Sequence, residues 1–358
     1  MGRYGADLTF LRPFFTFRFP PDGGITTTVY AHRAVRNLLV FEIEAHIASG
    51  FGTTVNVTLD RCHGAIDWAN LTDFDVAAGP AGARSLTVKR MEENCDAGHF
   101  CPANVDCPPD HGGPPVPKCH NAAMPPLPNT QVGLAFEAMP PMLTLTTDVP
   151  VKFVAAFHTS LEPGLAAPGM AAKAAAATLA AYAGGRSTPP GLRATHAAAW
   201  DAEWEGGIEI AGNLTIAASV NSSLYYILAA TRPDWPYGLS PGGLARDDYE
   251  GHSFWDCETW MFPNLVALFP RQALALTQYR SRRLPAARIR AATHGYAGAM
   301  WPWESALTGF GEYEANDDHE IHISGDVPNA FRLYFRMSRN VSWLRSAVRH
   351  FPAQFPPF

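Results

Sequence analysis

Apolar and polar residues alternate with a period of two in several short segments of the first 160 residues. In residues 36–46, Phe41 and Ile43 would face one side and Glu42 and Glu44 the other, which predicts an antiparallel strand with one solvent-exposed face. Further strands are predicted at residues 55–59, 86–89, 132–137, 142–147 and 151–158. Many short strands without helices between them indicate an antiparallel β-sandwich.

The pattern becomes helical after about residue 165. Residues 170–183 are rich in alanine, which has the highest helix propensity, and Gly184 and Gly185 would end this helix. Further helices are predicted at residues 194–204, 217–231, 256–268, 271–293 with a break near Pro285, 326–337 and 341–351. The long loops between these helices hold the unusual residues of the chain, and functional residues concentrate on loops.

This change of pattern predicts an α+β multidomain chain. We expect a β-sandwich domain over residues 1–165, a helical linker over residues 166–215 and a helical domain over residues 216–358. A cysteine-rich stretch at residues 92–128 would be inserted between two strands of the sandwich.

Composition and charge narrow the classes of function. Charged residues make up only 17% of the 358 residues and hydrophobic residues 47%, so most of the chain must bury a core. The net charge of −6 gives no support for a nucleic-acid or membrane-surface partner. No window approaches the 18 or so apolar residues of a membrane span, and the first seven residues lack the pattern of a signal peptide.

Four cysteines, Cys95, Cys101, Cys107 and Cys119, fall within the Pro- and Gly-rich insertion. Three interpretations are open: disulfides that staple a surface insertion, reduced cysteines in a loop, or a zinc site shared with nearby histidines. The spacing lacks the C-x2-C and C-x4-C pairs that are typical of zinc sites. Glycosylation sequons at Asn56, Asn70, Asn213, Asn221 and Asn340 favour disulfides and a secretory route, which the missing signal-peptide pattern contradicts.

The densest candidate site is a Gly-rich stretch, residues 238–243, followed by an aromatic and acidic one, residues 251–263. An indole such as that of Trp255 can stack on the apolar face of a pyranose, and a carboxylate such as that of Asp256 can accept hydrogen bonds from neighbouring hydroxyls. The alternative is structural, with Asp256 as a helix N-cap and both Trp255 and Trp260 in the core.

Two further stretches, residues 298–305 and 319–326, place Trp303, Glu304 and His322 in loops before helices. The order of residues 319–322 is not the H-E-x-x-H of zinc peptidases, and the acidic residues before it lack the order of a calcium loop. The chain also lacks a G-x-S-x-G, a P-loop and a dinucleotide fingerprint, so we predict neither a metal nor another cofactor.

Taken together, these stretches resemble the central catalytic domain of glycoside hydrolase family 65. The resemblance is strongest over residues 190–340 and rests on residues 238–243, 251–256, 259–263, 279–280, 295–299, 303–305 and 320–323. It implies an N-terminal β-sandwich, a helical linker and an (α/α)6 barrel, of which residues 216–358 would form the first part.

The resemblance also implies an activity and a set of site residues. Family members cleave α-glucosides with inversion, and the substrate implied here is glucosyl-galactosyl-hydroxylysine. Asp256 would hold sugar hydroxyls and Trp255 would position the ring, while Trp303, Glu304 and His322 would line the same pocket. The partner would therefore be a small carbohydrate or a glycopeptide.

The family's general acid lies in a later motif, so we expect it beyond Phe358, with no catalytic residue in this chain and no activity from it alone. Three alternatives are open. One is a phosphorylase of the same family that acts on an α-linked disaccharide, and another is a non-catalytic carbohydrate-binding or regulatory module. The third is a helical structural protein in which these tryptophans and aspartates are core residues and caps.

Overall fold

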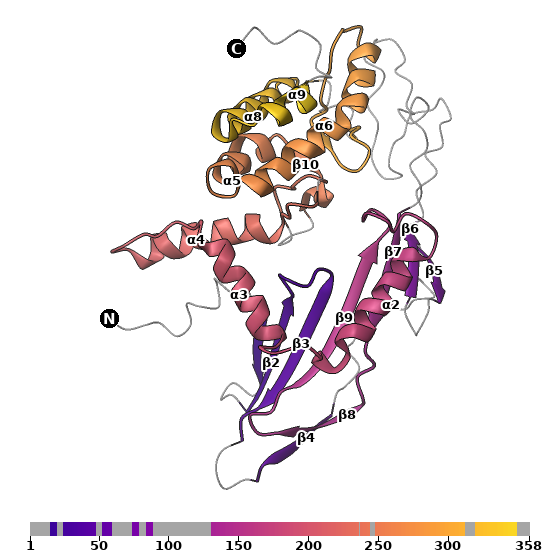
Figure 1. Ribbon diagram of the computed structural model, residues 1–358, viewed down its shortest axis with the longest axis vertical. Coiled ribbons are helices and arrows are strands. Elements are labelled where there is room, and N and C mark those ends of the chain that lie inside the picture. The colour runs from indigo at the N-terminus through magenta and orange to yellow at the C-terminus, as the bar shows by residue number, and fades with distance from the viewer. Residues whose placement is uncertain are drawn as a thin grey trace, which may run out of the picture. The chain divides into compact units, whose positions relative to one another are not determined.

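The computed structural model describes residues 15–19, 24–47, 52–58, 74–78, 84–88, 130–235, 237–243, 248–311 and 319–348. These residues separate into two compact units, one up to Glu205 and one from Gly206 onward (Figure 1). The first unit is mainly an antiparallel sheet and the second is mainly helical, which confirms the predicted α+β class. No described helix combines the length and the apolar character needed to cross a membrane.

The first unit is built on a seven-stranded sheet with the order β1-β2-β3-β9-β7-β6-β5. Its strands are β1 (Phe15–Phe19), β2 (Ile25–Ala31), β3 (Leu38–Ala45), β5 (Phe74–Ala78), β6 (Arg84–Val88), β7 (Gln131–Phe136) and β9 (Val151–Thr159). Strands β4 (Thr54–Thr58) and β8 (Met142–Thr146) form a separate antiparallel pair. Each predicted strand is present near its predicted bounds, and β1, β2 and β5 are additional.

Different elements cover the two faces of the large sheet. On one face a buried cluster joins the sheet to the β4–β8 pair, with Ile43, Ala45, Leu143 and Leu145 as its members. On the other face a second cluster contains Tyr30, Leu38, Val40, Val154 and Leu192. Leu192 begins α3 (Leu192–Trp204), so a helix packs on this second face.

Helix α2 (Met170–Tyr182) also packs on the sheet, along β7 and β9 (Figure 1). The approach is closest at Gly133, where an added Cβ would lie 2.2 Å from the carbonyl carbon of Ala171. Alanines on both elements make this possible: Ala135, Ala175 and Ala176 form a buried cluster. A short 3-10 turn, η3 (Ala183–Gly185), follows α2 and contains Gly184 with a φ of 66°, so the predicted glycine stop is confirmed.

The prediction of a solvent-exposed face on residues 36–46 is wrong for Glu42, whose side chain is only 1% exposed. Its carboxylate accepts a hydrogen bond from the Tyr30 hydroxyl over 2.9 Å. It also pairs with Lys152 Nζ at 3.3 Å and with Arg193 Nε of α3 at 3.4 Å. Because buried charges need partners, α3 and β9 supply the cations that let Glu42 remain under a helix.

The second unit contains α4 (Leu214–Ala229), η4 (Asp248–Gly251), η5 (Cys257–Met261), α5 (Phe262–Leu268), α6 (Pro270–Thr293), α8 (Ile323–Ser338) and α9 (Val341–Val348). Two short strands, β10 (Ser253–Phe254) and β11 (Glu304–Ser305), pair antiparallel. The predicted helices of this half are therefore confirmed, whereas the (α/α)6 barrel remains a prediction.

The predicted break near Pro285 is wrong, because α6 continues through this residue. Pro285 itself is exposed, so its ring meets solvent rather than the core. Its neighbours Leu284, Ala286 and Ala287 are buried, and their packing holds the helix together despite the missing backbone donor.

The cysteine-rich insertion at residues 92–128 lies outside the described residues. The predicted disulfides among Cys95, Cys101, Cys107 and Cys119 therefore stay a prediction, and so do the domain boundaries expected at residues 165 and 215.

Candidate functional site

Pairing of β10 with β11 brings the first two candidate stretches together. In this register Ser253 lies opposite Ser305 and Phe254 lies opposite Glu304. The ring of Trp303 meets Phe254 edge-on, with 5.0 Å between their centroids. Residues separated by about fifty positions in the sequence thus lie side by side.

The third candidate stretch reaches the same place through an aromatic cluster, which we define as Trp255, Trp260 and His322. The ring centroids of Trp255 and His322 are 5.2 Å apart and the rings are nearly perpendicular. Trp255 and Trp260 are 5.9 Å apart with an interplanar angle of 57°. Trp260 is 61% exposed, so its predicted alternative role as a core residue is wrong.

Asp256 follows Trp255 and precedes the helical segment η5. Its backbone is already helical, with φ of −52° and ψ of −36°, and its side chain does not cap the helix. Within the part of the chain that the structure describes, this half-buried carboxylate makes no hydrogen bond or ion pair. The alternative in which the Asp256 side chain caps the helix is therefore wrong.

The η5 segment is π-helical: the Phe262 backbone N–H donates to the Cys257 carbonyl, five residues earlier. This wide turn buries Cys257 and Glu258 while leaving Trp260 exposed. Single π-turns inside helices are frequent at functional sites. Here the turn lets one short segment supply both buried and exposed groups.

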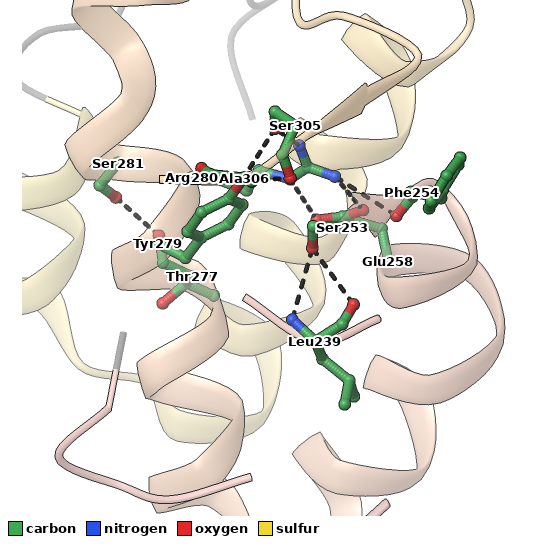
Figure 2. A network of polar contacts seen from close by, with 10 residues as sticks. All are labelled: Leu239, Ser253, Phe254, Glu258, Thr277, Tyr279, Arg280, Ser281, Ser305 and Ala306. Carbon is green, nitrogen blue, oxygen red and sulfur yellow. Dashed lines mark hydrogen bonds and ion pairs between the residues drawn. The ribbon is translucent and has the colours of Figure 1, made fainter. Parts of the chain in front are cut away.

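Beneath this segment lies a buried polar network centred on Arg280 of α6, drawn in Figure 2. Arg280 holds Glu258 through two bonds, Nε to Oε1 at 2.7 Å and Nη2 to Oε2 at 2.9 Å. Its guanidinium also donates to the Phe254 carbonyl and to Ser305 Oγ, both over 3.4 Å. One side chain thereby ties η5, β10 and β11 together.

The neighbouring Tyr279 extends the buried polar network (Figure 2). Its hydroxyl lies 2.8 Å from the Ser305 carbonyl and 2.9 Å from the Ala306 carbonyl. Burial raises the pKa of Tyr279, so the hydroxyl stays protonated and remains a donor. Ser253 Oγ in turn bonds the backbone of Leu239, which anchors the Gly-rich stretch.

Glu304 and Trp303, both predicted to line a sugar pocket, have partners within the protein. Glu304 is fully buried and bonds His252 Nδ1. Trp303 is partly buried against Phe254. Direct contact of either residue with a sugar remains a prediction.

His322 lies at the start of α8 and is 44% exposed. Its Nδ1 is 2.7 Å from Asp326 Oδ2, and its Nε2 is 2.9 Å from Glu320 Oε2. Partial burial acts to lower the pKa of His322, but the hydrogen bonds and charges of Asp326 and Glu320 outweigh it and raise the pKa above its ordinary value.

The stretches that build this site lie within a segment that matches a known protein family. Residues 222–349 match the glycosyl hydrolase family 65 central catalytic domain. The resemblance predicted from the sequence is thereby confirmed.

One relative extends the similarity beyond this segment, over most of the chain. The chain is 31% identical over 329 residues to a protein-glucosylgalactosylhydroxylysine glucosidase from Dictyostelium discoideum, covering 88% of this chain and 40% of that protein. It is 39% identical over 153 residues to a kojibiose hydrolase from Flavobacterium johnsoniae, covering 42% and 22%. The chain thus spans less than half the length of these relatives.

A solved structure shares the fold of this chain. A putative kojibiose phosphorylase from the human microbiome aligns with a TM-score of 0.62, covering 94% of this chain and 42% of that chain. The sequence identity is 14%, so this match speaks for the fold alone.

Sequence reasoning missed two features of the family 65 segment. The pairing of Glu258 with Arg280 joins two different helical elements, and no spacing rule within one helix links residues 22 positions apart. The bond between His252 and Glu304 depends on the pairing of β10 with β11, two strands of two residues each. The sequence signal for His252, Arg280 and Glu304 was their place in the family-like stretches, whereas Glu258 lies between two of these stretches.

Proposed function

We propose that this chain supplies the glucose-binding subsite of an inverting α-glucosidase that releases glucose from glucosyl-galactosyl-hydroxylysine. One observation carries the proposal: the half-buried Asp256 carboxylate lacks a hydrogen-bond partner among the described residues, and Asp256 directly follows Trp255 in the chain. The similarity to family 65 and to a glucosidase of this name supports the choice of substrate.

The two side chains have complementary chemistry for a sugar. A carboxylate accepts two hydrogen bonds from adjacent hydroxyls, and these charge-assisted bonds are about twice as strong as neutral ones. The Trp255 ring offers an apolar face to the C–H face of the same pyranose. His322 packs edge-on against Trp255, so it would fix the orientation of the indole rather than touch the reacting bond.

The proposal assigns substrate binding to this chain and no proton transfer. Inverting hydrolysis requires a general acid and a general base about 6.5–9.5 Å apart, and we place neither group among these residues. In a phosphorylase, phosphate would replace the activated water while glucose occupied the same subsite. Binding of glucose is therefore the property to measure on this chain.

The test is calorimetric titration of the full chain with glucose. Asp256→Asn removes the charge at constant shape, and we expect it to lower the affinity about tenfold or more. Asp148→Asn is the matched control, because Asp148 is 74% exposed in the first unit and asparagine tolerates its φ of 58°. Absence of glucose binding by the unmodified chain, or equal affinity of the Asp256→Asn variant, would refute the proposal.

A further inference from the structure

The exposure of Trp260 is unusual for such a large aromatic side chain, which proteins bury on average. Trp260 is 61% exposed on a segment whose adjacent residues Cys257, Glu258 and Phe262 are buried. The segment itself is well anchored, because Asn264 Nδ2 donates to the Trp260 carbonyl over 2.8 Å and Arg280 holds Glu258. The indole is thus presented to solvent by a rigid backbone.

Trp260 adjoins the proposed glucose subsite. Its ring centroid is 5.9 Å from that of Trp255, and it follows Asp256 by four residues on the same helical segment. We propose that the Trp260 indole is the platform for a second sugar ring, the unit linked to the glucose held by Trp255 and Asp256. This inference rests on the proposed function and adds a second subsite to it.

The geometry of the two indoles favours linked sugars over other ligands. The rings are tilted by 57°, so a ligand that stacks on both must change plane between them. Two pyranoses joined through one oxygen can turn in this way, whereas a flat fused-ring ligand cannot.

The polar groups around the indoles point to the same ligand. The Asp256 carboxylate can accept hydrogen bonds from hydroxyls, and so can Oε1 of Glu320, whose Oε2 lies 2.9 Å from His322 Nε2. An apolar peptide segment would bury these carboxylates without satisfying them, which is costly. A sugar combines C–H faces for the rings with hydroxyl donors for the carboxylates.

The experiment compares glucose with the disaccharide kojibiose in titrations of the full chain. We expect the unmodified chain to bind the disaccharide more tightly than glucose. Trp260→Ala should lower disaccharide affinity about threefold to tenfold and leave glucose affinity unchanged. Trp260→Phe should retain part of the advantage, because it keeps a flat ring.

Two further variants make the comparison specific. Tyr226→Ala removes an aromatic side chain that is 55% exposed on α4 and should change neither affinity. Trp260→Leu keeps an apolar side chain without a flat face, so it should behave like Trp260→Ala. If Trp260→Ala does not fold, the contrast between the Leu and Phe variants decides the question.

The outcomes separate the two proposals. If the unmodified chain binds no glucose, the proposed function fails and the second subsite fails with it. If glucose binds and depends on Asp256, but kojibiose binds no better or the Trp260 variants weaken both ligands equally, the second subsite alone is overturned. If Trp260→Ala weakens kojibiose binding and leaves glucose binding unchanged, the second subsite is supported.

Discussion

The segment from Ser253 to Met261 carries two groups of side chains in opposite environments. Glu258 lies in the buried polar network, where its 5% exposed side chain is held by Arg280 through two short bonds. Asp256, two residues earlier, is half-buried and bonds no described residue. The same carboxylate chemistry is therefore satisfied within the protein at Glu258, and is not satisfied by any described residue at Asp256.

This difference distinguishes the residues that hold the backbone from the residues of the proposed binding site. A carboxylate removed from water must be paired, so Glu258 and Arg280 have no capacity left for a ligand. A carboxylate in contact with water can exchange that water for sugar hydroxyls at little cost. We infer that the buried polar network fixes the backbone, and that the aromatic cluster with Asp256 uses the fixed backbone to bind.

Breaking the buried polar network should give the largest loss of stability. Arg280→Leu leaves the Glu258 carboxylate buried without its cation, and we expect it to lower the free energy of unfolding by about 3–5 kcal/mol. Denaturant unfolding measures the change. Arg282→Leu is the matched control, because Arg282 is exposed on the same helix and should change stability by less than about 0.5 kcal/mol.

Equal stability of the two arginine variants would contradict the scaffold role. The double variant Glu258→Leu with Arg280→Leu sharpens the test. It should recover part of the lost stability, because no charge then remains buried alone.

A substitution in the Gly-rich stretch, at the edge of the same network, should cause a smaller loss of stability. Gly238 has a φ of 92°, and an added Cβ would lie 2.9 Å from Ser253 Oγ and 3.4 Å from the Tyr279 ring. We expect Gly238→Ala to cost about 2–4 kcal/mol, from left-handed strain together with overpacking. Thermal or denaturant unfolding measures this cost.

Gly251→Ala separates these two causes. Gly251 has a similar φ of 76°, but nothing lies within 4 Å of its added Cβ, so only about 1–2 kcal/mol of strain is expected. If both alanine variants lose the same stability, packing against Ser253 and Tyr279 contributes nothing.

The sequence predicted those elements of the fold that depend on local patterns, and it missed those that depend on tertiary contacts. Strand β3 and helix α2 were predictable because their patterns are local. Strand β2 was missed because threonines occupy its inward positions: Thr26 and Thr28 are buried, so the strand shows no apolar alternation. The covered face at Glu42 depends on α3, and the unbroken helix at Pro285 depends on the packing of α6 against other helices such as α8.

Some features of the candidate site could likewise be predicted from the sequence and others could not. Residue type and proximity in sequence singled out Trp255 and Asp256, and the structure places His322 against Trp255. Whether the three line one sugar pocket stays a prediction. Neither the exposure of Trp260 nor the burial of Glu304 could be predicted, because both depend on how η5 and β11 pack. Burial, rather than residue type, decides which carboxylates remain open to a ligand.

The smallest predicted effect concerns His322, the titratable member of the aromatic cluster. Its pKa is raised in the folded chain, so its contribution to stability is fully present below the ordinary histidine pKa of about 6.5. This contribution is lost as the pH rises through the raised pKa, because the neutral ring can no longer donate to both Asp326 and Glu320. The stability difference between the unmodified chain and His322→Gln should therefore be largest at acidic pH.

Thermal unfolding at a series of pH values from about 5 to 9 measures this difference, and an NMR titration of the imidazole gives its pKa directly. His319→Gln is the control, because His319 is exposed and its side chain makes no hydrogen bond or ion pair with the described residues. Since the His322 side chain is 44% exposed, solvent and salt screen its ion pairs, and added salt should shrink the effect. A difference that grows toward alkaline pH would show that the two carboxylates do not hold the protonated ring, and the proposed orientation of Trp255 by His322 would lose its support.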